Sequence, residues 1–247
     1  MPGRMIEFDS AGTAAPGYLA TPVNHAGTAA PGVVVLHAWW GLTEPFRQVC
    51  DRLAEAGFVA LAPDLYRGKS TSLVAEAEAL GADLDQRVER WRGDIAGAVR
   101  FLRQDGYLRQ DRQHDSTSAS SSAASDSVAL LGFSLGGAYA LDMSAILPDE
   151  IDAVVVFYDA YADPEYGAAR AAYLCHFAAD DAFLPAEKVA DLGRALQAAG
   201  RPATFYTYPG TKHWFFEANR PDAYDAAAAA LAWERTIAFL NATLSRR

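Results

Sequence analysis

The chain has 247 residues, 51% of them hydrophobic, with a formal net charge of −10 and an isoelectric point near 4.9. The length suits one large α/β domain with a sizeable core, and the acidic balance argues against nucleic-acid binding because negative surfaces repel phosphate. Apolar runs are too short for a membrane span, and the N-terminus lacks the apolar segment of a signal peptide. We therefore expect a cytoplasmic protein that does not bind membranes.

Strand-like and helix-like segments alternate along the chain. A short hairpin comes first, and the helical pattern over residues 73–104 is expected to break near Gly81. A serine- and alanine-rich stretch over residues 114–127 is predicted to be a flexible surface insertion or a disordered loop, and no chemistry is assigned to it. The predicted strands span residues 5–10, 16–22, 32–37, 58–64, 127–134, 151–161, 171–181 and 203–210, and the predicted helices span residues 46–57, 73–104, 135–147, 185–200 and 221–240.

This alternation predicts a mostly parallel sheet with helices on both faces, because parallel strands need right-handed crossover connections. No linker or internal repeat interrupts the alternation, so residues 1–247 are predicted to form a single domain. Ligands of such sheets bind at the carboxyl ends of the strands, so the chemistry is expected in the loops that follow the strands.

Cys50 and Cys175 both lie in apolar segments and are expected to be buried, reduced thiols. No pair of histidines has the spacing of metal ligands. Neither a metal nor another cofactor is therefore expected.

The predicted strand over residues 127–134 ends in the sequence GFSLG (residues 132–136), which fits the G-x-S-x-G pattern of a nucleophile elbow. Small residues let the strand turn sharply into a helix around a strained serine, here Ser134. An acid follows a later strand and His213 follows the last one, which is the chain order expected of this motif. The alternative interpretation is an ordinary glycine-rich turn, with His213 a surface residue.

A serine hydroxyl is a weak nucleophile at neutral pH and needs an adjacent base. His213 would accept the proton of Ser134, and an acid would hold the imidazole in its useful tautomer. Three aspartates at strand ends are candidates for that acid, with Asp181 ranked first, Asp180 second and Asp159 third. Two of the three are expected to be ordinary loop or cap carboxylates.

The negative oxygen of a tetrahedral intermediate needs backbone donors, which form an oxyanion hole. The amide of Leu135 at the start of a helix is one candidate, and the amide of Trp39 in the loop after residues 32–37 is the other. Aromatic side chains in the same loops are predicted either to line an apolar substrate pocket or to belong to the core. The pocket candidates are Trp39, Trp40, Tyr158 and Trp214, whereas His37 and His176 are expected to be core histidines.

Seven segments, in order over about residues 32–240, resemble the dienelactone hydrolase family. They read HAWWGL, AGFVALAPDLYRG, GDIAGAVRFLR, GFSLGG, AADDAFLP, YPGTKHWF and AWERTIAFL. The resemblance implies an α/β-hydrolase fold of about eight mostly parallel strands without a large lid. It also implies that Asp181 and His213 are triad members, and it supports Trp39 and Leu135 as amide donors.

Three positions depart from the best-known enzymes of that family. Those enzymes have cysteine where this chain has Ser134. They also have a glutamate that tunes the thiol, and this chain has Ala38 at the corresponding position. Glu44 lies farther along the chain and is not assigned that role. Those enzymes also bind a substrate carboxylate with arginines, and one of these corresponds to Glu217 here. A carboxylated dienelactone is therefore not the expected substrate.

Together these observations predict a serine hydrolase of small carboxylic esters or lactones that works as a monomer or small homo-oligomer. Neutral or apolar short acyl groups suit the aromatic loops better than anions do. Two alternatives stay open. One is an acyl-transferring enzyme on the same triad, and the other is a hydrolase-fold binding protein whose triad is unused.

Overall fold

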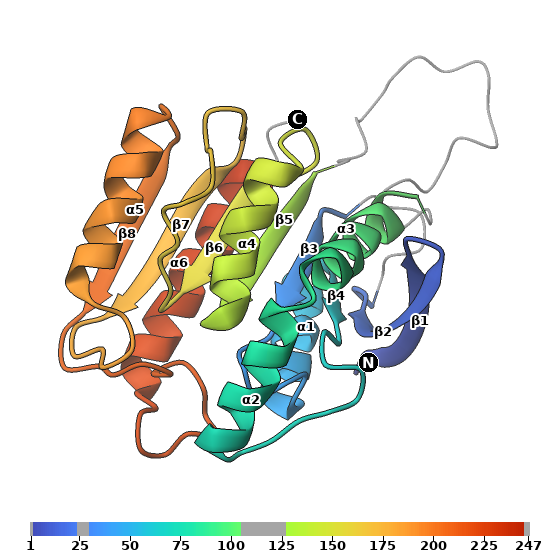
Figure 1. Ribbon diagram of the computed structural model, residues 1–247, viewed down its shortest axis with the longest axis horizontal. Coiled ribbons are helices and arrows are strands. Elements are labelled where there is room, and N and C mark those ends of the chain that lie inside the picture. The colour runs from blue at the N-terminus through green and yellow to red at the C-terminus, as the bar shows by residue number, and fades with distance from the viewer. Residues whose placement is uncertain (1, 24–29, 105–126, 245–247) are drawn as a thin grey trace.

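A computed structural model describes residues 2–23, 30–104 and 127–244 of the chain. Eight strands form one sheet in the order β1-β2-β4-β3-β5-β6-β7-β8 (Figure 1). The strands are β1 (Arg4–Ser10), β2 (Thr13–Ala20), β3 (Gly32–Leu36), β4 (Val59–Pro63), β5 (Val128–Phe133), β6 (Ala153–Phe157), β7 (Ala172–Ala178) and β8 (Ala203–Tyr208). The helices are α1 (Glu44–Glu55), α2 (Val74–Asp85), α3 (Val88–Gln104), α4 (Leu135–Ile146), α5 (Ala186–Ala198) and α6 (Ala226–Leu244).

The sheet is mostly parallel. The strands from β4 to β8 in the sheet order pair in parallel, while β1 and β2 form an antiparallel hairpin that adds to the edge of β4. Parallel pairing places the carboxyl ends of β3 and β5 to β8 at one edge of the sheet, which is the lower edge in Figure 1. The predicted α/β-hydrolase fold, a mostly parallel sheet of about eight strands, is confirmed.

Helices cover both faces of the sheet because successive strand residues point to opposite sides. In β3, Val33 and Val35 belong to the core cluster that includes residues of α1 and α6 on one face. Val34 and Leu36 belong to the cluster that includes residues of α3, α4 and α5 on the other face. All five residues of β3 are buried, as expected for a strand with helices on both sides. The fold therefore consists of three layers, with the sheet in the middle.

The predicted helix break near Gly81 is wrong. Gly81 lies inside α2 and is buried, and the chain turns instead at Gln86 and Arg87, where the Arg87 amide donates a 2.8 Å hydrogen bond to the carbonyl of Leu84. A glycine weakens a helix without ending it. The next helix, α3, buries one apolar face that includes Trp91, Ile95 and Val99.

The serine- and alanine-rich stretch lies outside the described residues up to residue 126, and Ser127 is buried just before β5. Strand β5 leads into Ser134 at its carboxyl end. Its first residue, Val128, therefore lies at the end of the strand that is distant from the candidate site. None of the described helices is long and apolar enough to cross a membrane.

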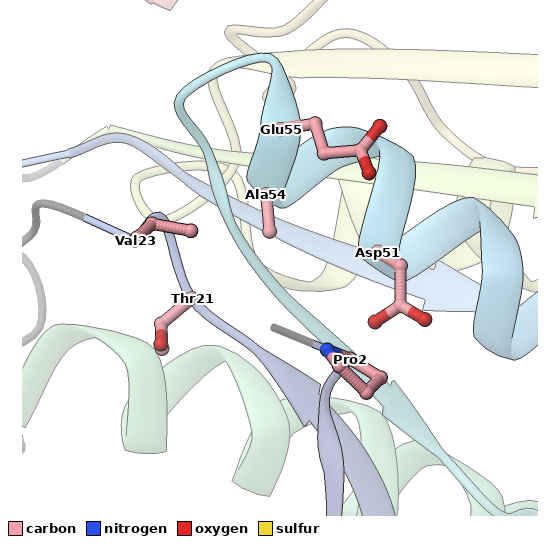
Figure 2. A pocket seen from close by; sticks show the side chains of 6 residues that line it. All are labelled: Pro2, Thr21, Val23, Asp51, Ala54 and Glu55. Atoms are coloured by element: carbon pink, nitrogen blue, oxygen red, sulfur yellow. The ribbon is translucent and has the colours of Figure 1, made fainter.

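A cavity of about 290 Å³ lies between α1 and the N-terminal strands (Figure 2). Asp51 on α1 accepts a 2.7 Å hydrogen bond from the Gly3 amide and so ties the start of the chain to this helix. The cavity adjoins the end of β2, which pairs with the beginning of β4, so it lies at the opposite edge of the sheet from Ser134. Its lining residues are Pro2, Thr21, Val23, Asp51, Ala54 and Glu55.

Two glycines on α3 test how closely this helix packs against β1. A Cβ added at Gly97 would lie 2.5 Å from the carbonyl oxygen of Asp9, whereas one added at Gly93 would come no closer than 3.5 Å to another residue. We expect Gly97→Ala to lower the free energy of unfolding by about 1–3 kcal/mol through overpacking. The matched Gly93→Ala variant is expected to be neutral or to gain up to about 1 kcal/mol, because alanine favours the helix. Urea denaturation measures both, and equal effects would contradict this packing.

Candidate active site

Ser134 lies in a sharp turn between β5 and α4. Its φ of 49° is in the left-handed region, which a non-glycine residue adopts only where its surroundings enforce it. A Cβ added at Gly132 would lie 2.2 Å from the Gly136 carbonyl oxygen, and one added at Gly136 would lie 2.4 Å from the carbonyl oxygen of Leu36. Both positions therefore require glycine, because strand, helix and the neighbouring β3 backbone approach so closely.

The structure brings Ser134, His213 and Asp181 together in a continuous hydrogen-bonded arrangement. The Oγ of Ser134 lies 3.0 Å from Nε2 of His213, and Nδ1 of His213 lies 2.9 and 2.8 Å from the two carboxylate oxygens of Asp181. The three residues follow β5, β8 and β7 respectively. The imidazole and carboxylate are 7% and 4% exposed, so water competes little for their hydrogen bonds.

Asp181 is itself fixed by the backbone of its loop. Its Oδ1 accepts hydrogen bonds of 2.9 Å from the amides of both Phe183 and Leu184. These two donors keep the carboxylate oriented toward His213.

The other two candidate acids lie elsewhere. Asp180 is exposed, and its backbone amide donates to the carbonyl of Thr211. Asp159 follows β6, and within the described residues its side chain makes no hydrogen bond to His213. Burial, and to a lesser extent the negative charge of Asp181, raises the pKa of Asp159 to about 7. Among the three aspartates, only Asp181 contacts the imidazole.

The two predicted oxyanion donors lie on segments that meet at the start of α4. Leu135 is the first residue of α4, so its amide has no partner within the helix. Trp39 lies in the loop between β3 and α1, and in the described part of the chain neither amide donates to a backbone carbonyl outside the regular elements. A Cβ added at Gly136 would lie 2.7 Å from the carbonyl oxygen of His37, so this loop packs closely against the start of α4.

His37 holds the loop that contains Trp39. Its Nδ1 donates to the carbonyl of Ala38 at 2.7 Å, which leaves Nε2 to accept the Leu65 amide at 3.3 Å. Burial lowers the pKa of His37 and keeps the ring neutral. His37 is a buried histidine with hydrogen-bond partners on both ring nitrogens, as predicted.

His176 is also a core histidine, as predicted. Its two ring nitrogens lie 2.9 Å from the Tyr208 hydroxyl and 3.1 Å from the Thr236 hydroxyl. Burial, followed by the positive charge of Arg235, lowers its pKa to about 3. Cys50 and Cys175 are both buried and free.

An aromatic cluster surrounds His213. The Phe183 ring lies 5.1 Å from the imidazole and 4.8 Å from the Trp214 ring, and 51% of Phe183 is exposed. Trp39 is partly exposed and packs 5.8 Å from Phe183. Phe183 is not among the pocket residues predicted from the sequence, although its place two residues after Asp181 is a signal that could have found it. The remaining pocket candidates, Trp40, Tyr158 and Trp214, are at most 5% exposed.

Glu217 does not face outward from its loop. It is 2% exposed, and its Oε1 accepts a 2.7 Å hydrogen bond from the hydroxyl of Tyr158. Burial raises the pKa of Glu217 to about 8. The sequence could not show that this carboxyl points into the protein, because the neighbours of a loop residue depend on how distant segments pack.

No cluster of three or more histidine, cysteine, aspartate or glutamate side chains within residues 2–23, 30–104 and 127–244 is arranged to hold a metal ion. The polar side chains that meet at the end of the sheet are a serine, a histidine and an aspartate joined by hydrogen bonds.

Known proteins of the same fold match this chain over nearly its whole length. The model of the dienelactone hydrolase family matches residues 15–244. The chain belongs to this family. As a member of the family it is a hydrolase.

Two relatives align over nearly the whole chain. Protein usf of Aquifex pyrophilus is 31% identical over 98% of this chain and 100% of its own length. The carboxymethylenebutenolidase of Rhodococcus opacus is 26% identical over 93% of this chain and 89% of its own. A solved dienelactone hydrolase-like promiscuous phosphotriesterase from metagenomic libraries superposes with a TM-score of 0.81 at 21% identity, covering 98% of both chains.

Proposed function

We propose that this protein is a serine hydrolase of small carboxylic esters or lactones, in which Ser134 is the nucleophile. The observation that carries the proposal is the chain of hydrogen bonds from Ser134 through His213 to Asp181. Membership of a hydrolase family supports it, and so does the name of the Rhodococcus relative, which denotes a butenolide, a cyclic ester.

In the proposed reaction, Oγ of Ser134 attacks the ester carbonyl carbon while Nε2 of His213 accepts its proton. The carbonyl π electrons move to oxygen, and the negative oxygen is stabilised by the amides of Leu135 and Trp39. The tetrahedral intermediate then expels the alkoxide, which takes the proton from His213. Asp181 keeps Nδ1 protonated and stabilises the transient imidazolium.

Water completes the cycle. His213 accepts a proton from a water molecule, the resulting hydroxide adds to the acyl carbon, and the second tetrahedral intermediate releases Oγ of Ser134, which recovers its proton from His213. The products are a carboxylic acid and an alcohol, or a hydroxy acid from a lactone. No step needs a cofactor.

The role of Ser134 can be tested with a fluorophosphonate probe and a p-nitrophenyl ester. The wild-type protein is expected to be labelled and to release p-nitrophenol in water alone, without an added acyl acceptor. Ser134→Ala should lose the label and lower turnover by about 10³-fold or more. An unlabelled wild type would favour the non-catalytic binding protein, and turnover that needs an added alcohol or amine would favour the acyl-transferring enzyme.

The role of Asp181 can be tested against its neighbour in the sequence. We expect Asp181→Asn to lower kcat by roughly 10²–10⁴-fold, because the imidazole loses both its orientation and its charge partner. Asp180→Asn is the matched control, and Asp159→Asn provides a second comparison. Both should stay within about threefold of the wild type, and an Asp181→Asn enzyme with full activity would refute the assignment.

The substrate is proposed to be neutral. The aromatic residues Phe183 and Trp39 offer apolar surface close to His213. Four residues after the histidine, this chain has Glu217 where the best-known enzymes of the family have a carboxylate-binding arginine. A panel of esters and lactones of matched size, with and without a carboxylate, should show higher kcat/KM for the neutral members. A preference for the anionic members would contradict the proposal.

A further inference from the structure

Tyr158 and Glu217 form a buried hydrogen bond directly behind His213. The Tyr158 ring lies 4.9 Å from the imidazole, its hydroxyl donates to Glu217 at 2.7 Å, and the two residues are 0% and 2% exposed. Glu217 belongs to the same loop as His213, four residues further on. The hydrogen bond therefore joins the loop that contains the base to the end of β6.

The backbone on both sides of the imidazole is unusual. Tyr158 has a φ of 44° and Trp214, next to His213, has a φ of 67°. Non-glycine residues stay in this left-handed region only where surrounding contacts hold them there. At one end, the Tyr158 amide donates to the His176 carbonyl at 2.8 Å. At the other end, the Glu217 amide donates to the Trp214 carbonyl at 2.9 Å.

We propose that Tyr158 and Glu217 are positioning residues for His213, and that their hydrogen bond holds the imidazole between Ser134 and Asp181. This inference rests on the proposed function, since it assumes that His213 is the base. Among the described residues, the imidazole is also bonded to Ser134 and Asp181. Two further rings lie close to it, those of Trp214 at 5.1 Å and of Phe183 at 5.1 Å, and Phe183 is half exposed. The Tyr158 ring supplies a wall that solvent does not reach.

The charge state of the pair suits this role. Burial raises the pKa of Glu217 to about 8, with Tyr158 and the positive charge of Arg220 opposing the rise. The other polar neighbour of its carboxyl is Trp40, and the Arg220 guanidinium lies over the Trp40 ring at 4.6 Å. A raised pKa favours the uncharged carboxyl, which accepts the hydrogen bond without placing a negative charge in the buried loop.

Two variants remove the hydrogen bond between Tyr158 and Glu217, and a third variant retains it. Tyr158→Phe keeps the ring and deletes the donor, Glu217→Leu deletes the acceptor, and Glu217→Gln keeps an acceptor oxygen. Tyr173→Phe is the matched control, because this tyrosine is also buried and its hydroxyl is bonded to Ser144 at 2.8 Å near the opposite end of the sheet.

The readouts are kcat and KM for a neutral p-nitrophenyl ester, the rate of fluorophosphonate labelling, and the melting temperature. Tyr158→Phe and Glu217→Leu should lower kcat and labelling by about 10- to 100-fold with KM within about twofold, because a displaced base costs rate more than binding. Glu217→Gln should recover most of the activity. Tyr173→Phe should lose melting temperature to a similar extent and keep its kcat.

The double variant Tyr158→Phe with Glu217→Leu should be no slower than either single variant, because both remove the same interaction. Wild-type kcat in both single variants, or an equal loss in Tyr173→Phe, would overturn the inference while leaving the proposed function intact. An unlabelled, inactive wild type would instead refute the proposed function itself. If Glu217→Leu does not fold, Tyr158→Phe and Glu217→Gln still decide the outcome.

Discussion

The close approach of three backbones at the end of β5 is the constraint on which the rest of this structure depends. Strand β5, the first turn of α4 and the end of β3 pack so tightly at Gly132 and Gly136 that a Cβ at either position would overlap a carbonyl oxygen. This packing forces Ser134 into a left-handed conformation and places the serine at the edge of the sheet. It also sets the loop after β3 against the start of α4, the two segments that contain the proposed oxyanion donors.

The remaining polar groups of the site are held by loops rather than by the sheet, and each loop is fixed by its own hydrogen bonds. Two backbone amides orient Asp181, while His37 bridges the loops that follow β3 and β4. The loop of His213 is joined to β6 through Glu217 and Tyr158. The rigid sheet thus fixes the strand ends, and these local interactions set the side-chain geometry to within a hydrogen-bond distance.

Most of the architecture followed from sequence periodicity and chain order. Buried strands such as residues 32–36 are continuous apolar runs, so their number and parallel arrangement were predictable. The break in the helical region was misplaced because Gly81 is the stronger local signal, whereas the actual turn is closed by a hydrogen bond to Leu84 that no propensity scale contains. The rank order of Asp181, Asp180 and Asp159 was derived from strand-end position, and position alone does not show which carboxylate contacts the imidazole.

The sequence by itself determined the fold class, the strand-to-helix turn around Ser134 and the chain order of serine, acid and histidine, because each depends on local residue patterns and on their order along the chain. Only the tertiary structure decided that Asp181 contacts His213 and that Glu217 turns inward to Tyr158. Those contacts join residues 32 and 59 positions apart in the chain. Their geometry depends on how separate strand-end loops meet at one edge of the sheet, which local sequence does not encode.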